Sequence, residues 1–144
     1  MTNHDNSNST NSVFETEIIV RPDDIDMNNH VHNSKYLDYI QTARFIQMRD
    51  CYKVPMEEYF ERGFTWFASE VQLKYKREMK FGDIAVVKTK VDQWSGAQVT
   101  INVWVFNKST NKVCVEGKIL YTLVSISSGR PARIPEDIIE RHRI

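Results

Sequence analysis

Three side chains near the amino-terminal end of the sequence have the types and spacing of a hydrolytic site. Asp26, Asn28 and His30 are two residues apart, so in extended backbone they would project to one side and could converge on one substrate. An ionised carboxylate can attack a carbonyl or take a proton from water, an amide can donate to the carbonyl oxygen, and an imidazole exchanges protons near neutral pH. These parts suit the cleavage of an ester. Because Asp and Asn also favour turns and caps, an ordinary connecting loop is the alternative interpretation.

The elements on both sides of this segment would position these side chains. The alternation of apolar and polar residues over 14–21 predicts a half-buried strand, which Pro22 ends because it lacks a backbone donor and restricts the residue before it. A helix capped by Asn33 or Ser34 should follow, with its body over residues 35–51. The unpaired N–H groups of its first turn could stabilise the oxyanion of acyl transfer.

The remaining sequence predicts one sheet with short helices at its margins. The expected elements are a short helix over 56–62, strands over 64–75, 84–94, 98–106 and 113–126, and a short surface helix within 134–144. Turn signals at Gly82-Asp83 and Ser95-Gly96 indicate an antiparallel meander. A strand, a loop, a long helix and then consecutive strands predict an α+β fold in which one helix covers one sheet.

Length and charge narrow the classes of partner. The chain has 144 residues, which suits one domain, and its 19 basic residues equal its 19 acidic ones. Without an overall field, nucleic acid and anionic membranes are not expected as partners. No apolar stretch approaches the roughly 18 to 20 residues needed to cross a bilayer, so we expect a soluble protein.

The first twelve residues and the two cysteines indicate the compartment. Residues 1–12 are rich in Asn, Ser and Thr and have neither a basic start nor an apolar core, so we interpret them as a disordered polar tail before a domain over 13–144. Cys51 and Cys114 provide neither a disulfide framework nor a paired metal motif, and we expect buried thiols. These features favour the cytoplasm.

The chemistry-bearing segment resembles a known signature. The run from Asp26 to Tyr36, Asp-Met-Asn-Asn-His-Val-His-Asn-Ser-Lys-Tyr, is similar to that of hotdog-fold thioesterases, especially plant-type acyl-ACP thioesterases and bacterial acyl-CoA thioesterases related to 4-hydroxybenzoyl-CoA thioesterase. The later run Leu73-Lys74-Tyr75-Lys76-Arg77-Glu78 resembles the strand that carries an active-site glutamate in acyl-ACP thioesterases. The resemblance implies a single hotdog domain, an antiparallel sheet wrapped around one long helix, that hydrolyses acyl-CoA or acyl-ACP to free acid and thiol.

The resemblance also implies roles for individual residues. Asp26 matches the nucleophile or general base, Asn28 and His30 match the amide and imidazole of the acyl-ACP branch, and Glu78 matches its glutamate, which could hold His30 or act as a base. The positions implied in substrate binding are Val31, His32, Asn33 and Tyr36. His32 departs from the family, which usually has an asparagine there, so its role stays open.

The resemblance further implies an oligomer. Plant enzymes of this type contain two hotdog repeats, whereas this chain has room for one. We therefore expect a homodimer or homotetramer with active sites near the subunit interface.

Neither a metal nor another cofactor is expected. His30 and His32 could lie beside Asp26 as metal ligands, but no helical His-Glu-x-x-His pattern or cysteine pair accompanies them. Aromatic residues that could line an acyl tunnel, or simply pack, are Tyr36, Tyr39, Trp66, Phe67, Trp94 and Trp104. Two alternative functions stay open: a hotdog hydratase or dehydratase, and a non-catalytic module that only binds acyl thioesters.

Overall fold

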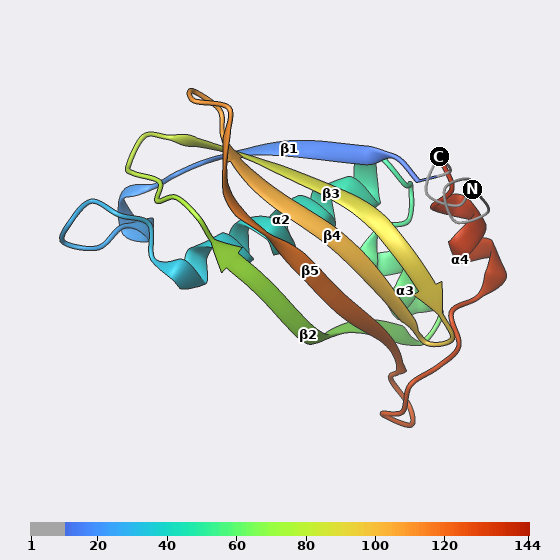
Figure 1. Ribbon diagram of the computed structural model, residues 1–144. Helices are drawn as coiled ribbons and strands as arrows, with labels where there is room; N and C mark the ends of the chain where they lie inside the picture. Colours follow the sequence, from blue (N-terminus) through green and yellow to red (C-terminus); the bar gives the residue numbers. More distant parts are fainter. Residues whose placement is uncertain (1–10) are drawn as a thin grey trace.

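A curved sheet lies against one long helix. The computed structural model describes residues 11–144, so most of the predicted polar tail, residues 1–10, lies outside the described residues. The elements are β1 (Val13–Ile19), the 3-10 turn η1 (Pro22–Asp24), α2 (Asn33–Asp50), α3 (Met56–Glu61), β2 (Phe64–Tyr75), β3 (Ile84–Ser95), β4 (Gln98–Asn107), β5 (Lys112–Ser125) and α4 (Glu136–Arg141). The strands pair antiparallel in the order β1-β3-β4-β5-β2, and α2 lies across one face of them (Figure 1). The predicted α+β architecture is confirmed.

The two-residue period of the central strand defines the core. In β4, Val99, Ile101, Val103 and Val105 are buried and alternate with half-buried residues. On the helix, Tyr36, Ile40 and Ala43 recur at the spacing of one helical face and pack into the same core cluster. The sheet and helix therefore form one layer each around a shared apolar interior.

Helix α2 begins two residues earlier than its predicted body. The N-cap is His32 rather than Asn33 or Ser34, and among the described residues no side chain caps the helix there. The His32 N–H donates to the Asp24 carbonyl at 3.0 Å, and the His32 carbonyl accepts from Lys35 N–H at 2.9 Å. The preceding loop thus fixes the start of the helix through the backbone.

The position of β2 differs from a continuous meander. The hairpin order holds for β3, β4 and β5, but β2 pairs with β5 at the far edge, and the turn at Gly82-Asp83 does not join neighbouring strands. Gly117 on β5 permits this pairing, because a Cβ there would lie 1.8 Å from the Gln72 carbonyl oxygen on β2. The sequence pattern identified the strands but not which edge β2 occupies.

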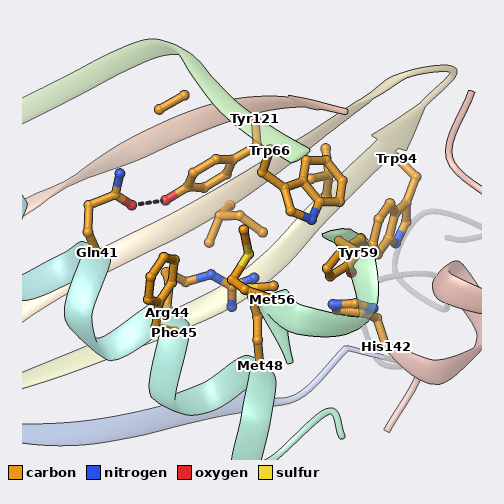
Figure 2. A pocket seen from close by; sticks show the side chains of 13 residues that line it. Gln41, Arg44, Phe45, Met48, Met56, Tyr59, Trp66, Trp94, Tyr121 and His142 are labelled. Atoms are coloured by element: carbon orange, nitrogen blue, oxygen red, sulfur yellow. Dashed lines mark hydrogen bonds between the residues drawn. The ribbon is translucent and has the colours of Figure 1, made fainter. Parts of the chain in front are cut away.

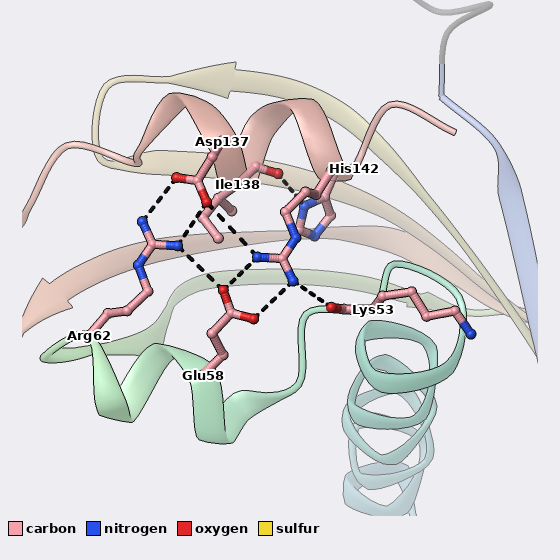
Figure 3. A network of polar contacts seen from close by, with 7 residues as sticks. Lys53, Glu58, Arg62, Asp137, Ile138 and His142 are labelled. Carbon is pink, nitrogen blue, oxygen red and sulfur yellow. Dashed lines mark hydrogen bonds and ion pairs between the residues drawn. The ribbon is translucent and has the colours of Figure 1, made fainter.

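The carboxy-terminal helix α4 is docked, not simply superficial. Pro135 is its N-cap, and Ile138 and His142 are buried against the body of the protein. Arg62 and Arg141 bind Asp137 and Glu58 across α3 and α4, as Figure 3 shows. The His142 ring stacks on Tyr52 with 4.3 Å between centroids. The short helix α4 is thereby joined to the core by apolar, aromatic and ionic contacts.

We predict that His142 makes stability depend on pH. Burial lowers the pKa of its imidazole from 6.5 to about 4, so between these values the unfolded chain binds more protons than the folded one. Stability should be full above pH 6.5 and fall as the pH drops toward 4, with a loss of up to about 3 kcal/mol. Urea unfolding of the wild type and of His142→Gln at several pH values measures this, and the variant should lose most of the slope. The control His32→Gln leaves the buried imidazole in place and should keep the slope; equal slopes in His142→Gln and the wild type would contradict the assignment.

Candidate active site

The loop that carries Asp26, Asn28 and His30 is a closed turn. Asp26 N–H donates to the His30 carbonyl at 2.8 Å, Asn29 N–H donates to the Asp26 carbonyl at 3.1 Å, and Ile25 bridges Val31 in antiparallel fashion. Asn29 has a φ of 62°, a left-handed conformation that Asn tolerates. The extended geometry inferred from the two-residue spacing is therefore wrong, because the backbone reverses between Asp26 and His30.

The Asp26 carboxylate organises this turn. Its Oδ1 accepts from the backbone N–H of Asn28 at 2.8 Å and of His30 at 3.0 Å. The His30 N–H is the main cause that lowers the pKa of Asp26 below 3.8, with smaller contributions from Asn28 N–H and the two nearby imidazoles, against a partial opposing effect of desolvation. Asp26 is therefore an anion at neutral pH. Within residues 11–144, its Oδ2 takes part in no hydrogen bond and is available to a substrate or water.

His30 and Glu78 meet across two distant segments. The Nδ1 of His30 lies 2.9 Å from Oε1 of Glu78, and the two side chains are about one third and three fifths exposed. Glu78 stands three residues after the end of β2 at Tyr75, so it lies in a connecting segment and not in the strand that the resemblance implied. The segment after β2 passes beside the loop and so brings the predicted imidazole and glutamate together.

The backbone of Met79 holds these two segments in register. Met79 carbonyl accepts from Val31 N–H at 2.9 Å, and Met79 N–H donates to the hydroxyl of Tyr36 at 3.0 Å. Tyr36 is buried in the first turns of α2, and burial raises its pKa to about 12. Val31 follows His30 and Met79 follows Glu78 in the sequence. These two hydrogen bonds, which we call the Met79 clamp, therefore fix the separation of the catalytic candidates.

Two structural partners of the loop were missed from sequence. Asp24 is only 3% exposed and accepts from Tyr39 hydroxyl at 2.7 Å and Arg21 N–H at 3.0 Å. Burial, with the Asp24 hydrogen bond next, raises the pKa of Tyr39 well above its usual range. The signal was the spacing of a capping box, with Pro22 at the first position of the 3-10 turn and an acid two residues later. Asn29, whose Oδ1 accepts from Phe81 N–H at 3.1 Å, had no comparable signal.

The other predicted site residues lie around this cluster with different exposure. Asn28, His32 and Asn33 are exposed along the turn and the start of α2, whereas Val31 and Tyr36 are buried. The structure thus brings together Asp26, His30 and Glu78. The catalytic role of Asn28 and the substrate-binding roles of Val31, His32, Asn33 and Tyr36 stay predictions.

A separate cavity lies farther along α2. It has a volume of about 160 Å³ and is lined by side chains that include Trp66, Trp94, Tyr121 and Arg44 (Figure 2). Of the aromatic residues proposed for an acyl tunnel, Trp66 and Trp94 line this cavity, while Trp104 lines a groove on the other side of the sheet. Asp26, His30 and Glu78 do not border the cavity, so we assign the bond-breaking chemistry to the loop and not to the cavity.

Known proteins share this architecture. The chain overlaps the DHNA-CoA thioesterase of Staphylococcus aureus over 90% of its length and 87% of that chain, with a TM-score of 0.82 and 17% identity. A hypothetical protein of Staphylococcus aureus, solved in complex with CoA, matches over 90% of this chain and 81% of that one, with a TM-score of 0.82 and 16% identity. These likenesses confirm the hotdog fold.

Two sequence comparisons also match the chain to thioesterases. The chain is 26% identical over 124 residues to Acyl-acyl carrier protein thioesterase ATL3 of Arabidopsis thaliana, a match that covers 86% of this chain and 64% of that protein. The family model described as Thioesterase-like superfamily matches residues 20–141, which include the loop, the Glu78 segment and the sheet. By this match the chain belongs to the thioesterase-like superfamily.

Proposed function

We propose that the protein hydrolyses an acyl thioester of CoA or acyl carrier protein to a free acid and a thiol at the Asp26, His30 and Glu78 cluster. Family membership supports thioester hydrolysis. The observation that carries the assignment to this site is the 2.9 Å contact of His30 Nδ1 with Glu78. The backbone N–H of the same histidine donates to the Asp26 carboxylate. A thiol-release assay over acyl-CoA and acyl-ACP substrates tests it directly.

The geometry suits His30 as the residue that moves a proton. With Nδ1–H donated to Glu78, the ring presents Nε2 as an acceptor, which can take a proton from the hydrolytic water, whether that water attacks the thioester or an anhydride formed on Asp26. Glu78 fixes the tautomer and stabilises the imidazolium that forms, as a carboxylate does when it orients a catalytic histidine. The departing thiolate is a good leaving group and needs no strong acid.

The lowered pKa of Asp26 bears on its role. A carboxylate that already accepts two backbone N–H bonds is a weak base at neutral pH, whereas its free Oδ2 retains the charge needed to attack the carbonyl. Direct attack by Oδ2 would form a mixed anhydride, which water activated by His30 would then hydrolyse. In this scheme the carboxylate is the nucleophile and the His30–Glu78 pair serves the second step.

The carrier is proposed from similar proteins, and the compartment from the state of the two thiols. CoA is favoured by the relative solved in complex with CoA, and acyl carrier protein by the Arabidopsis relative. Within residues 11–144, no helix combines the length and the apolarity needed to cross a bilayer. Cys51 and Cys114 are both unpaired thiols, Cys114 being buried and Cys51 half-buried, which supports a reducing cytoplasm.

Strand β2 is the proposed subunit interface. It lies at one edge of the sheet, and the exposed apolar side chains of Phe67, Val71 and Tyr75 follow its length. An unpaired edge with exposed apolar residues is a template for another strand. Strand β1, the other edge, is shorter and exposes Glu15 and Glu17 between its apolar ends, Val13 and Ile19. We propose that two copies associate through β2.

Asp26→Asn should lower turnover by roughly a hundredfold to ten-thousandfold. Asn keeps an oxygen for the Asn28 and His30 N–H groups but removes the charge needed for attack or proton abstraction. Thiol release with a reactive acyl-CoA measures the loss, and circular dichroism checks the fold. Near-wild-type turnover would remove Asp26 from the chemistry, while retained binding with no turnover in the wild type would favour a non-catalytic binding module.

His30→Ala should lower turnover far more than His32→Ala. Only His30 contacts Glu78, whereas His32 is an exposed N-cap residue whose side chain makes no capping bond. Positioned proton transfer is worth about a hundredfold to ten-thousandfold, so the two losses should be well separated. Steady-state hydrolysis of one acyl-CoA by both folded variants measures the two losses. Equal losses, or a larger loss in His32→Ala, would contradict the proton-transfer role of His30.

Tyr36→Phe should lower both stability and turnover. It leaves the buried Met79 N–H without its acceptor, which costs about 1 to 3 kcal/mol and loosens the segment that carries Glu78. Tyr39→Phe is the matched control, since it deletes a buried hydroxyl bonded to Asp24 and does not touch Met79. Urea unfolding and thiol release should show a stability loss in both variants and the larger turnover loss in Tyr36→Phe. The reverse order of turnover would show that the clamp does not position the site.

If two copies associate through β2, a charge placed on this edge should weaken their association. Val71→Lys places a charge on the exposed edge and should shift sedimentation at micromolar concentration toward monomer. Ile19→Lys alters an exposed apolar residue at the opposite edge and should leave the assembly unchanged. A strictly monomeric wild type, or dissociation by Ile19→Lys alone, would rule out β2 as the interface.

A further inference from the structure

The cavity along α2 contains a buried cation that forms no ion pair with any residue the structure describes. Arg44 is 6% exposed and lines the cavity, where Figure 2 shows it among apolar and aromatic side chains. Across residues 11–144 it takes part in no salt bridge, its Nη1 reaches Thr89 Oγ1 only at 3.4 Å, and its guanidinium carbon lies 5.6 Å from the centroid of the Tyr52 ring. Its Nε is buried and, among the described residues, has no hydrogen-bond partner. A buried charge that lacks a counter-charge is costly, so this arrangement calls for an explanation.

The chemistry of the cavity walls indicates what could complete Arg44. The lining is mostly apolar and aromatic and includes no Asp or Glu. A second buried donor on this wall, Trp94 Nε1, also has no acceptor within the described part of the chain. An apolar space with unsatisfied donors and a positive charge is complementary to an alkyl chain that ends in a carboxylate.

We propose that Arg44 determines substrate specificity by binding the distal carboxylate of an ω-carboxyacyl thioester. This inference rests on the proposed thioesterase function and names the substrate class. The planar guanidinium can hold a carboxylate by two parallel N–H bonds, and the surrounding Met48, Met56 and Trp66 side chains would cover the methylene chain. Occupation of the cavity would also neutralise the buried charge, so the acyl group supplies the counter-charge that residues 11–144 do not provide.

The position of Arg44 sets a lower limit on chain length. It follows Asn33, the first residue of α2, by eleven residues, which corresponds to roughly 16 Å along the helix axis. Long helical side chains lean toward the amino terminus, which shortens the path to His30. Phe45 is 59% exposed and lines the cavity, so the cavity opens to the surface beside it. A short acyl group would not reach from the thioester to Arg44, whereas a medium or long one would.

The kinetic test compares matched thioesters. Octanedioyl-, dodecanedioyl- and hexadecanedioyl-CoA are each assayed beside the monocarboxylic acyl-CoA of equal carbon number, with the wild type, Arg44→Met and Arg44→Lys. In the wild type at least one longer dioyl substrate should exceed its neutral match in kcat/KM by tenfold or more. Arg44→Met should abolish that preference, with a tenfold to hundredfold loss on the dioyl substrate and little change on the neutral one, and Arg44→Lys should retain part of it. The absence of a preference in the wild type, or an equal loss on both substrates, overturns the proposal.

A binding test separates this inference from the proposed function. Trp66 and Trp94 line the cavity, so tryptophan fluorescence reports its occupancy. Dodecanoic acid should bind the wild type at least tenfold more tightly than 1-dodecanol, and Arg44→Met should lose this difference. If no thioester is hydrolysed, the proposed function fails and the fluorescence result alone decides the role of Arg44; equal binding of acid and alcohol by the wild type overturns it.

Stability distinguishes a binding residue from a structural one. Replacement of an unpaired buried cation by Met of similar length should leave the urea midpoint unchanged or raise it. A strongly destabilised Arg44→Met would identify a structural residue and contradict the proposal if Arg44→Lys, which keeps the charge, also showed no selectivity for acid over alcohol.

Discussion

The backbone of Met79 is the point on which the active-site geometry depends. Its carbonyl accepts from Val31 and its N–H donates to Tyr36, so the segment after β2 is tied both to the loop and to α2. Neither bond involves a side chain that does chemistry. Because His30 precedes Val31 and Glu78 precedes Met79, these bonds bring an imidazole and a carboxylate from distant parts of the sequence to 2.9 Å. The site is therefore only as rigid as this pairing, in which both polar groups of one buried residue are satisfied.

Asp26 combines two duties that act in opposite directions. As the acceptor for two backbone N–H groups it closes the turn, and the same bonds lower its pKa and weaken it as a base. Its two oxygens have separate roles. Oδ1 accepts both backbone N–H bonds, whereas Oδ2 has no hydrogen-bond donor among the described residues. A protein that needed a strong general base would place it in a less polar setting, such as the apolar sites that raise carboxyl pKa values. The arrangement instead favours a carboxylate that stays ionised.

Local periodicity predicted the elements, and long-range pairing decided what the sequence could not show. Strand β4 alternates so regularly that its buried face could be read residue by residue, and the helix was placed within two residues at its start. The sequence also suggested candidate site residues, but not their geometry: a spacing of two implied an extended segment, whereas hydrogen bonds between Asp26 and the backbone of residues 28–30 reverse the chain. The buried Asp24 was missed because its partner Tyr39 lies fifteen residues away and pairs with it only once α2 has formed. The edge position of β2 depends on a close approach at Gly117 that no local pattern encodes.

The central claim is that His30 and Glu78 act as one unit beside Asp26. A double-mutant cycle on kcat/KM for acyl-CoA hydrolysis, with His30→Ala, Glu78→Gln and the double variant, measures this coupling. If Glu78 works by orienting the imidazole, its replacement should cost activity in the presence of His30 and almost nothing once His30 is gone, so the double variant should resemble His30→Ala. Fully additive losses would contradict the account, because they would show that the two side chains contribute independently despite their 2.9 Å contact.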